Sequence, residues 1–298
     1  MKRYIYYPGC SLKSTGKAYE ESLLAVFQKL GLHIEELPDW NCCGATSYAA
    51  IDEMQAFSLA ARNLAIAESG FDAEIHVVAP CNACYLVLLK TQKYMRDYER
   101  VRQTVERSLR AAGLIYRGTV HVRHPLDVLM NDAPRQTLAG MAVRSLKGKK
   151  IACYYGCQIV RPFAEFDNQQ NPVLLDQMVE LLGGEPIPWS LKTFCCGGSL
   201  TGTIPEAGLR LNDLILKEAR KRNAEAIITC CPLCQFNLEC FQDDIGRVFA
   251  DDVHIPVVYF TQLLGHSLGL SDRELGLHRS LSETPEWSVE EGGVGVHA

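Results

Sequence analysis

The chain lacks any apolar stretch long enough to cross a membrane, because no uninterrupted run approaches the roughly 20 residues that a transmembrane helix requires. It also lacks an excess of positive charge: 30 Lys and Arg stand against 35 Asp and Glu, for a net charge of −5. General binding to nucleic acid needs a basic face, so this function is disfavoured. Pro8 interrupts the N-terminal segment too early for a secretory signal peptide. We therefore expect a cytoplasmic protein with no transmembrane segment and no nucleic-acid partner.

Two widespread cofactor motifs are missing as well. The sequence contains no Cys-x-x-Cys-x-x-Cys-x-x-x-Cys-Pro run of the ferredoxin type, and no Gly-x-Gly-x-x-Gly follows a predicted strand. The chain therefore shows no evident electron carrier of these two kinds.

What the sequence does contain is 13 cysteines, ten of which form two copies of one pattern. In each copy a single cysteine is followed by an adjacent pair and then by a Cys-x-x-Cys. The first cysteine set is Cys10, Cys42, Cys43, Cys81 and Cys84, and the second cysteine set is Cys157, Cys195, Cys196, Cys231 and Cys234. Since cytoplasmic thiols are kept reduced, such clusters indicate metal binding or catalysis before structural disulfides.

The segments around the cysteines repeat in the same order. Apolar periodicity and turn residues predict helices over 14–30, 52–69, 85–112, 172–182 and 205–222, and buried strands over 3–7, 75–79, 150–155 and 226–229. A duplicated α/β domain accounts for this order. We predict a first domain at 1–148, a second at 149–270, and a polar C-terminal tail at 271–298 that is poorly ordered or forms an arm for a partner.

The residue types of the two sets suit iron and sulfide. Thiolate is the ligand that iron–sulfur clusters use, and each Cys-x-x-Cys can turn two sulfurs toward one site. Glycine after each adjacent pair permits a sharp turn or a close approach to inorganic sulfide, so Gly44, Gly197 and Gly198 are candidate cofactor-binding residues. Five cysteines per half exceed the four of a cubane or zinc site. The fifth must bridge two irons, stay free, or belong to a different cluster.

The two complete copies resemble the cysteine-rich CCG domain, which occurs twice in the B-type subunit of heterodisulfide reductases, from Cys10 to about Leu268. The resemblance implies two tandem Rossmann-like CCG domains. It also implies two [4Fe-4S] clusters of non-cubane type, one held by the first cysteine set and the other by the second cysteine set.

The same resemblance implies an oxidoreductase acting on sulfur groups. The catalytic subunit of this family cleaves, or reversibly forms, a small disulfide at the two clusters. Its expected partners are a ferredoxin-like iron–sulfur protein and a flavoprotein of the same complex. Three alternatives stay open: a subunit of a heterodisulfide-reductase-like complex of sulfur oxidation, a non-catalytic electron-relay subunit, and a zinc site in one half.

Three cysteines lie outside the two sets. Cys153 could replace Cys157 as the upstream ligand, although the repeat favours Cys157. We expect Cys230 to be a spectator beside the cluster and Cys240 to be a small buried residue.

Four polar residues are candidates for proton or substrate chemistry, because cleaving a disulfide to two thiols consumes two protons. His76 and His124 are candidate proton donors. For His76 the alternative is a buried core histidine, and for His124 it is a helix cap. Arg161 and Lys192 lie near the cysteines in sequence and could hold an anionic substrate, or be no more than solvated charges.

Overall fold

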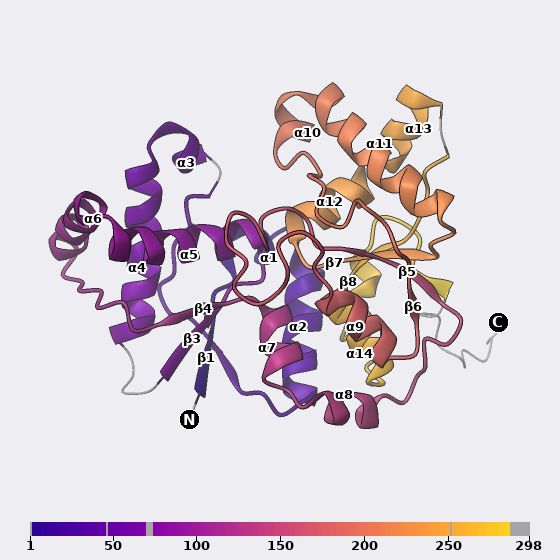
Figure 1. Cartoon of the computed structure of the whole chain (residues 1–298), viewed down its shortest axis with the longest axis horizontal. Helices are drawn as coiled ribbons and strands as arrows, with labels where there is room; N and C mark the ends of the chain where they lie inside the picture. The colour runs from indigo at the N-terminus through magenta and orange to yellow at the C-terminus, as the bar shows by residue number, and fades with distance from the viewer. Residues whose placement is uncertain (1, 46, 70–73, 251, 287–298) are drawn as a thin grey trace, which may run out of the picture.

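The computed structural model describes residues 2–45, 47–69, 74–250 and 252–286 and contains two four-stranded sheets (Figure 1). The strands of the first sheet are β1 (Lys2–Tyr6), β2 (Ile34–Glu36), β3 (Glu74–Val78) and β4 (His121–Arg123). Those of the second are β5 (Lys150–Tyr154), β6 (Glu185–Pro186), β7 (Ala226–Thr229) and β8 (Val257–Tyr259). The spatial orders are β2-β1-β3-β4 and β6-β5-β7-β8, and every pairing is parallel. The predicted duplicated α/β fold is confirmed.

The burial of the strands follows their place in the sheets. All four residues of β7, a central strand, are buried, as expected where helices cover both faces of a parallel sheet. The edge strands β2 and β6 are partly exposed and short.

Helices connect the strands in both halves. In the first half they are α1 (Gly9–Leu12), α2 (Lys17–Lys29), α3 (Ser47–Ile51), α4 (Glu53–Ser69), α5 (Asn82–Asp97), α6 (Glu99–Ala111), α7 (Pro125–Asn131) and α8 (Arg135–Met141). In the second half they are α9 (Leu174–Leu181), α10 (Leu200–Thr203), α11 (Pro205–Lys221), α12 (Pro232–Cys240), α13 (Gln242–Phe249) and α14 (Phe260–Ser267), followed by a 3₁₀ turn, η1 (Leu277–Arg279).

The single helix predicted over 85–112 is wrong, because the structure divides it into α5 and α6. Tyr98 between them has extended backbone angles (φ −124°, ψ 107°). This break lets α6 fold back, so that Val105 and Leu109 join the apolar cluster that contains Phe57 of α4. The burial of this second apolar face outweighs the continuity of the helix.

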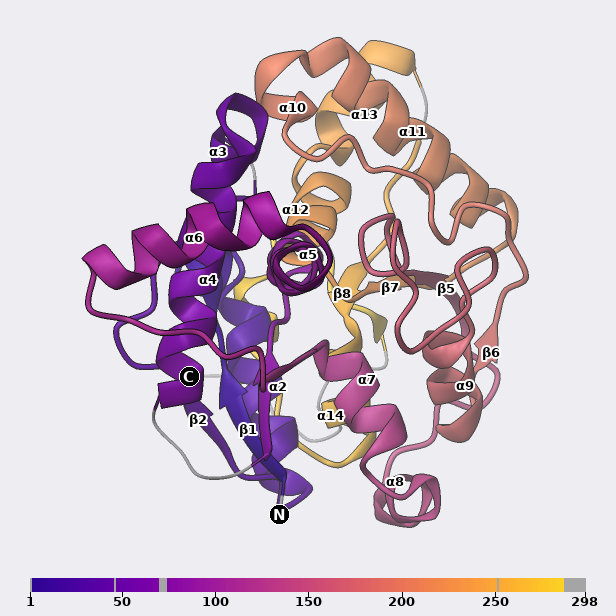
Figure 2. The ribbon, with the colours of Figure 1, turned by 60° about the vertical axis from the view of Figure 1, so that its left-hand side comes forward.

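The two halves are joined by helices that pack across the junction. The second half's α14 packs on α2, and the first half's α7 packs on α9. These four helices lie between the two sheets (Figures 1 and 2). One apolar core runs through them and includes Phe27, Leu129, Met178 and Leu264. The division at 148/149 falls in the loop between α8 and β5 and stays a prediction.

The first part of the predicted tail is packed on the protein rather than poorly ordered, and its alternative role as an arm for a partner stays a prediction. Leu275 and Leu277 are buried. Arg279 forms an ion pair of 2.8 Å with Glu21 on α2. Two leucines in an otherwise polar segment account for this docking. Residues 287–298 lie outside the described part of the chain.

Within the described residues, no helix is both long and apolar enough to cross a membrane.

The close packing of α10 on α11 depends on glycine at position 208. A β-carbon added at Gly208 would lie 2.5 Å from the backbone nitrogen of Thr201. We expect Gly208→Ala to lower the free energy of unfolding by about 2 kcal/mol, because two backbones must separate. Urea denaturation measures this loss.

The control for this substitution is Gly140→Ala on α8, where an added β-carbon meets nothing within 4 Å. It should raise stability by up to about 1 kcal/mol through helix propensity. A Gly208→Ala variant that gains stability in the same way would contradict the packing argument.

Candidate metal centre

Both cysteine sets lie at the carboxyl edges of the two sheets. Cys10 lies in α1, directly after β1, and Cys157 follows β5 at the equivalent place. Cys81 and Cys231 are the N-cap residues of α5 and α12, which follow β3 and β7. A helix N-terminus stabilises a thiolate. The strand order thus brings ligands from separate loops together at the usual functional edge of an α/β fold.

The first cysteine set extends from the surface into the core. Cys10 and Cys42 are exposed, whereas Cys43, Cys81 and Cys84 are buried. The sulfur atoms of Cys43 and Cys84 lie 3.1 Å apart. The backbone N–H of Gly44 donates to the sulfur of Cys42 at 3.4 Å.

The second cysteine set repeats this arrangement. The sulfur atoms of Cys196 and Cys234 lie 3.6 Å apart, and the N–H of Gly197 donates to the sulfur of Cys195 at 3.3 Å. Asn237 on α12 donates to the carbonyl oxygens of Cys196 (3.2 Å) and Gly198 (2.8 Å). Two contacts are therefore the same in both halves: the approach of the second paired cysteine to the last cysteine, and the N–H of the following glycine to the first paired cysteine.

Each set contains a thiol that its neighbours stabilise as thiolate. Hydrogen bonds from Cys42 and Cys84 lower the pKa of Cys43 to about 4. A hydrogen bond from Cys157, with smaller contributions from the N–H of Gly197 and the charge of Arg161, lowers the pKa of Cys195 to about 6. Thiolate is the form that binds iron.

The two cysteine sets meet at the first residues of their Cys-x-x-Cys motifs. The neighbouring thiol of Cys231 raises the pKa of Cys81. On Cys231, hydrogen bonds from Cys234 and Cys81 lower the pKa. The two sites are therefore neighbours across the junction of the halves.

A cavity of about 270 Å³ lies at the second cysteine set. All five cysteines of the set line it, together with Ala45, Asn82 and Ala83 of the first half and Gln158, Gly197, Gly198, Ser199 and Leu233 of the second. Within the described ranges, no three His, Cys, Asp or Glu side chains surround a point suited to one metal ion. The space is many times the roughly 10–15 Å³ that a single water needs. Its five sulfur donors fit an iron–sulfur cluster.

The glycines after the adjacent cysteine pairs approach helices closely. A β-carbon at Gly44 would lie 2.9 Å from Cα of Ala56 on α4, and one at Gly197 would lie 3.3 Å from Cα of Gly208 on α11. Gly198 has open space around this position. Close packing against a helix is the observed constraint at Gly44 and Gly197, and cofactor contact at all three glycines stays a prediction.

Two tyrosines that the sequence reasoning did not single out hold the adjacent cysteine pairs in place. Tyr7 is buried and donates to the carbonyl of Asn41 at 2.8 Å, and Tyr154 donates to that of Phe194 at 2.6 Å. Both accepting residues directly precede a Cys-Cys pair. The signal was present in the repeat, since a tyrosine stands three positions before Cys10 and Cys157 alike.

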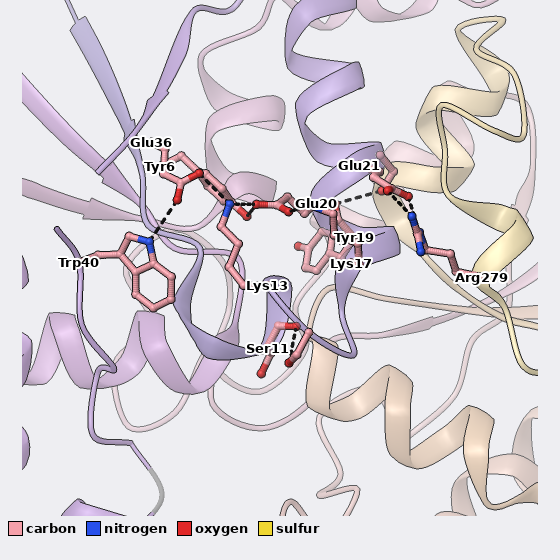
Figure 3. A network of polar contacts seen from close by, with 12 residues as sticks. Tyr6, Ser11, Lys13, Lys17, Tyr19, Glu20, Glu21, Glu36, Trp40 and Arg279 are labelled. Atoms are coloured by element: carbon pink, nitrogen blue, oxygen red, sulfur yellow. Dashed lines mark hydrogen bonds and ion pairs between the residues drawn. The ribbon is translucent and has the colours of Figure 1, made fainter. Parts of the chain in front are cut away.

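A polar network fixes the loop after Cys10 (Figure 3). The ammonium of Lys13 lies 2.5 Å from the buried carboxylate of Glu20 on α2 and 2.7 Å from Glu36 at the end of β2. Trp40 donates to Glu36 at 3.1 Å. The network thereby connects the loop that carries Cys10 to the segment that leads into Cys42.

The two candidate histidines lie in different surroundings. His124 is fully buried at the end of β4, and burial lowers its pKa to about 4. Its Nε2 lies 3.1 Å from the carbonyl oxygen of Pro80, and its Nδ1 accepts from the N–H of Leu126, which caps α7. His76 on β3 lies 3.1 Å from Glu74 and stacks on His121.

The two candidate cations also differ. The ammonium of Lys192 is buried, 2.7 Å from Asp176 and 3.2 Å from the carbonyl of Pro172. Arg161 is exposed, donates to the carbonyl of Thr193, and lies near enough to Cys195 to lower its pKa. Of the two, Arg161 is the cation beside the second cysteine set.

The three cysteines outside the two sets differ in burial. Cys153 is buried on β5, and burial raises its pKa. Cys230 is buried at the junction, with its sulfur 3.4 Å from the carbonyl of Tyr155. Cys240 at the end of α12 is half-buried rather than fully buried.

Comparison with known proteins gives matches over nearly the whole chain. The family model of the cysteine-rich domain CCG matches residues 4–89 and 151–239. The 8-methylmenaquinol:fumarate reductase membrane anchor subunit of Wolinella succinogenes is 28% identical over 283 residues, 94% of this chain and 97% of that protein. The B-type subunit of the ferredoxin/F(420)H(2)-dependent CoB-CoM heterodisulfide reductase of Methanosarcina acetivorans is 28% identical over 293 residues, 96% of each chain. The predicted resemblance is confirmed.

Among solved structures, a hypothetical protein from Helicobacter pylori superposes with a TM-score of 0.72 at 13% identity. The match covers 95% of this chain but only 52% of that one, so the chain spans about half the length of that protein. This similarity concerns the fold alone.

Gly156 lies close to the sulfur of Cys234 in the second cysteine set. Its φ is +72°, and an added β-carbon would lie 2.9 Å from the sulfur of Cys234. We expect Gly156→Ala to lower the free energy of unfolding by about 3 kcal/mol. The strain of left-handed backbone angles in alanine adds to the steric contact with the sulfur of Cys234. Urea denaturation of the full chain measures the loss.

Gly198→Ala is the matched control, because Gly198 has a φ of +59° but open space around its missing β-carbon. It should lose about 1 kcal/mol from backbone strain alone. Equal losses in the two variants would show that the sulfur of Cys234 does not require glycine at position 156.

Proposed function

The chain belongs to the family of proteins built on the CCG cysteine-rich domain, and on this premise we propose that it is the catalytic iron–sulfur subunit of a heterodisulfide-reductase-type complex. Relatives named as B-type subunits of heterodisulfide reductases, or as similar to them, align with it at 25–28% identity over 92–96% of its length. The observation that carries the proposal is the pair of five-cysteine sets whose Cys-x-x-Cys loops meet at one junction, where His124 contacts the carbonyl oxygens of Pro80 and Cys230.

In this proposal the ten cysteines of the two sets are the ligands of two [4Fe-4S] clusters of non-cubane type. Bound there, the clusters would supply single electrons to a sulfur–sulfur bond. The overall reaction consumes two electrons and two protons and converts one disulfide into two thiols. The thiolates stabilised at Cys43 and Cys195 support binding of iron at both sites. Cys153 is not needed as a ligand, because Cys157 faces the cavity.

The substrate is proposed to bind beside the cluster of the second cysteine set, on the side that faces the first half. Asn82 and Ala83 of the first half form part of the cavity wall, and Gln158 and Ser199 offer further polar groups there. Arg161 would attract the anionic ends of a substrate, supported by its influence on Cys195. Lys192 is proposed to be structural, since Asp176 already neutralises it.

Neither histidine is assigned as a proton donor. Both ring nitrogens of His124 are engaged in hydrogen bonds inside the protein. His76 has Glu74, Arg123 and His121 as its described polar and stacking partners, together with Tyr4. Water at the exposed thiols is the proposed proton source, because Cys42 and Cys195 reach the surface.

Electrons must reach the two sites from other proteins of a complex. The chain has no ferredoxin-type cysteine run, and its relatives are named as subunits of larger reductases. We propose a ferredoxin-like iron–sulfur protein as the direct donor and a flavoprotein behind it, both belonging to the same complex.

A second candidate function is that of an electron-relay subunit in a quinol:fumarate reductase-type complex. It is favoured by one observation, the 28% identity to the Wolinella succinogenes subunit over 97% of that protein's length. In that setting the clusters would pass electrons between a quinol and another protein of the complex and would not touch a disulfide.

Metal analysis tests the proposed cofactors. Anaerobically purified chain should contain about eight irons and eight acid-labile sulfides, the content of two four-iron clusters. Cys84→Ala and Cys234→Ala should each lower the iron content to about four, because each removes one ligand of one site. Cys240→Ala is the control and should leave the content unchanged.

About four irons with one zinc in the unmodified chain would leave a single redox site, and two-site cleavage of a disulfide would have to be abandoned.

Reoxidation of the reduced chain separates the two candidate functions. Mixed anaerobically with an anionic disulfide such as that of coenzymes M and B, the reduced chain should regain its oxidised absorbance at least tenfold faster than with a menaquinone analogue. Arg161→Gln should slow the reaction with the disulfide about fivefold, from the loss of one exposed charge pair of about 1 kcal/mol.

The matched control is Arg135→Gln, an exposed arginine on α8. Faster reoxidation by the quinone, or equal effects of the two arginine substitutions, would contradict the proposed substrate site.

A further inference from the structure

The imidazole of His124 joins the two Cys-x-x-Cys loops. Its Nε2 lies 3.1 Å from the carbonyl oxygen of Pro80 and 3.2 Å from that of Cys230. A carbonyl oxygen only accepts, so Nε2 carries the ring proton and donates to both. Pro80 directly precedes Cys81, and Cys230 directly precedes Cys231. One N–H therefore connects the backbones at the point where the two cysteine sets meet.

The ring of His124 is held in this orientation from several sides. Nδ1 accepts from the N–H of Leu126 at 3.1 Å. Phe166 stacks on the ring with an interplanar angle of 8°, and Tyr85 contacts it edge-on at a centroid distance of 5.8 Å. The side chain is fully buried. A ring fixed in this way can hold its two carbonyl partners at a constant separation.

The junction is not symmetric. The sheet register pairs Val78 with Arg123 and Ile228 with Val258, so Tyr259 occupies in the second half the position of His124. Tyr259 donates to Gln235 of its own half at 3.2 Å and does not bridge to the first half through its hydroxyl. The carbonyl of Cys230 has a second donor, the hydroxyl of Tyr19 at 3.2 Å. Among the residues that the structure describes, His124 is thus a side chain that donates to both loops.

We propose that His124 is a positioning residue that fixes the separation of Cys81 and Cys231 and thereby the spacing of the two cluster sites. This rests on the proposed function, in which both sites act on one substrate. Electron exchange between the sites and simultaneous contact with two sulfur atoms both depend on that spacing. The residue acts through the backbones of the loops and does not touch the reacting atoms.

Two substitutions separate the two hydrogen-bonding roles of the ring. In His124→Asn the side-chain oxygen can replace Nδ1 as the cap of α7, since Asn is a favoured N-cap residue, but the donor at the Nε2 position is lost. In His124→Gln the amide nitrogen reaches the Nε2 position, and the cap is lost instead. The pair therefore tests the bridge to Pro80 and Cys230 independently of the helix cap.

Amide hydrogen exchange of the full chain as purified gives a readout that does not depend on activity. In His124→Asn, peptides covering 79–85 and 229–235 should exchange about fivefold faster than in the unmodified chain, and the peptide covering α7 should not change. In His124→Gln the reverse is expected, with about fivefold faster exchange confined to α7. Loops that stay protected in His124→Asn, or equal effects of both variants on the loops, would overturn the proposal.

Paramagnetic resonance of the reduced, loaded protein gives the second readout. The interaction between the two sites should change in His124→Asn at unchanged iron content and stay as in the unmodified chain in His124→Gln. An unaltered spectrum in His124→Asn would overturn the claim that His124 sets the spacing of the sites. If the chain proves to hold no iron, the proposed function fails, and the exchange experiment still decides whether His124 holds the two loops.

Discussion

The packing of α2 against α14 and of α7 against α9 is the constraint on which the rest of the structure depends. Each half covers a helix of the other, and residues such as Phe27, Leu129 and Leu264 bury their apolar surface in one shared core. Apolar burial contributes roughly 25 cal/mol per Å², so a core of this extent holds the halves in one relative position. In that position the loops that carry Cys81 and Cys231 meet at one junction, where His124 contacts the carbonyl oxygens of Pro80 and Cys230. A pair of independent domains would carry the same ten cysteines without making them neighbours.

Duplication has left the two halves alike where they hold sulfur and different where they meet. Tyr7 and Tyr154 make the same hydrogen bond to the residue before each cysteine pair. The junction, by contrast, has His124 on one side and Tyr259 on the other. The constraint on sulfur is local, because each loop must present its thiols at a fixed geometry. The constraint at the junction concerns both halves at once, and the N–H of His124 meets it by donating to one carbonyl of each loop.

The sequence predicts those features that depend on local pattern. Continuous apolar runs located the central strands, and the cysteine spacing located both sets, because period and spacing are properties of the chain itself. The break at Tyr98 could not be read in this way, since it depends on the burial of Val105 and Leu109 against α4. The role of His124 as a bridge was equally hidden: its partners Pro80 and Cys230 lie 44 and 106 residues away in sequence. Lys192 and Arg161 are equivalent candidates in the sequence. Only the structure distinguishes them, because it places Asp176 beside Lys192.

Two neighbouring sites suit the proposed reaction, which needs two electrons from carriers that deliver one at a time. A single one-electron site would have to hold a half-reduced sulfur species until the next electron arrived. In the proposed function, two sites whose Cys-x-x-Cys loops are joined by His124 would each receive one sulfur of the cleaved disulfide. A relay subunit needs two neighbouring centres as well, but it gains nothing from a wall that brings Asn82 and Ala83 of one half against the thiols of the other. Within the proposed function, the placement of that wall supports direct contact with a substrate over electron relay alone.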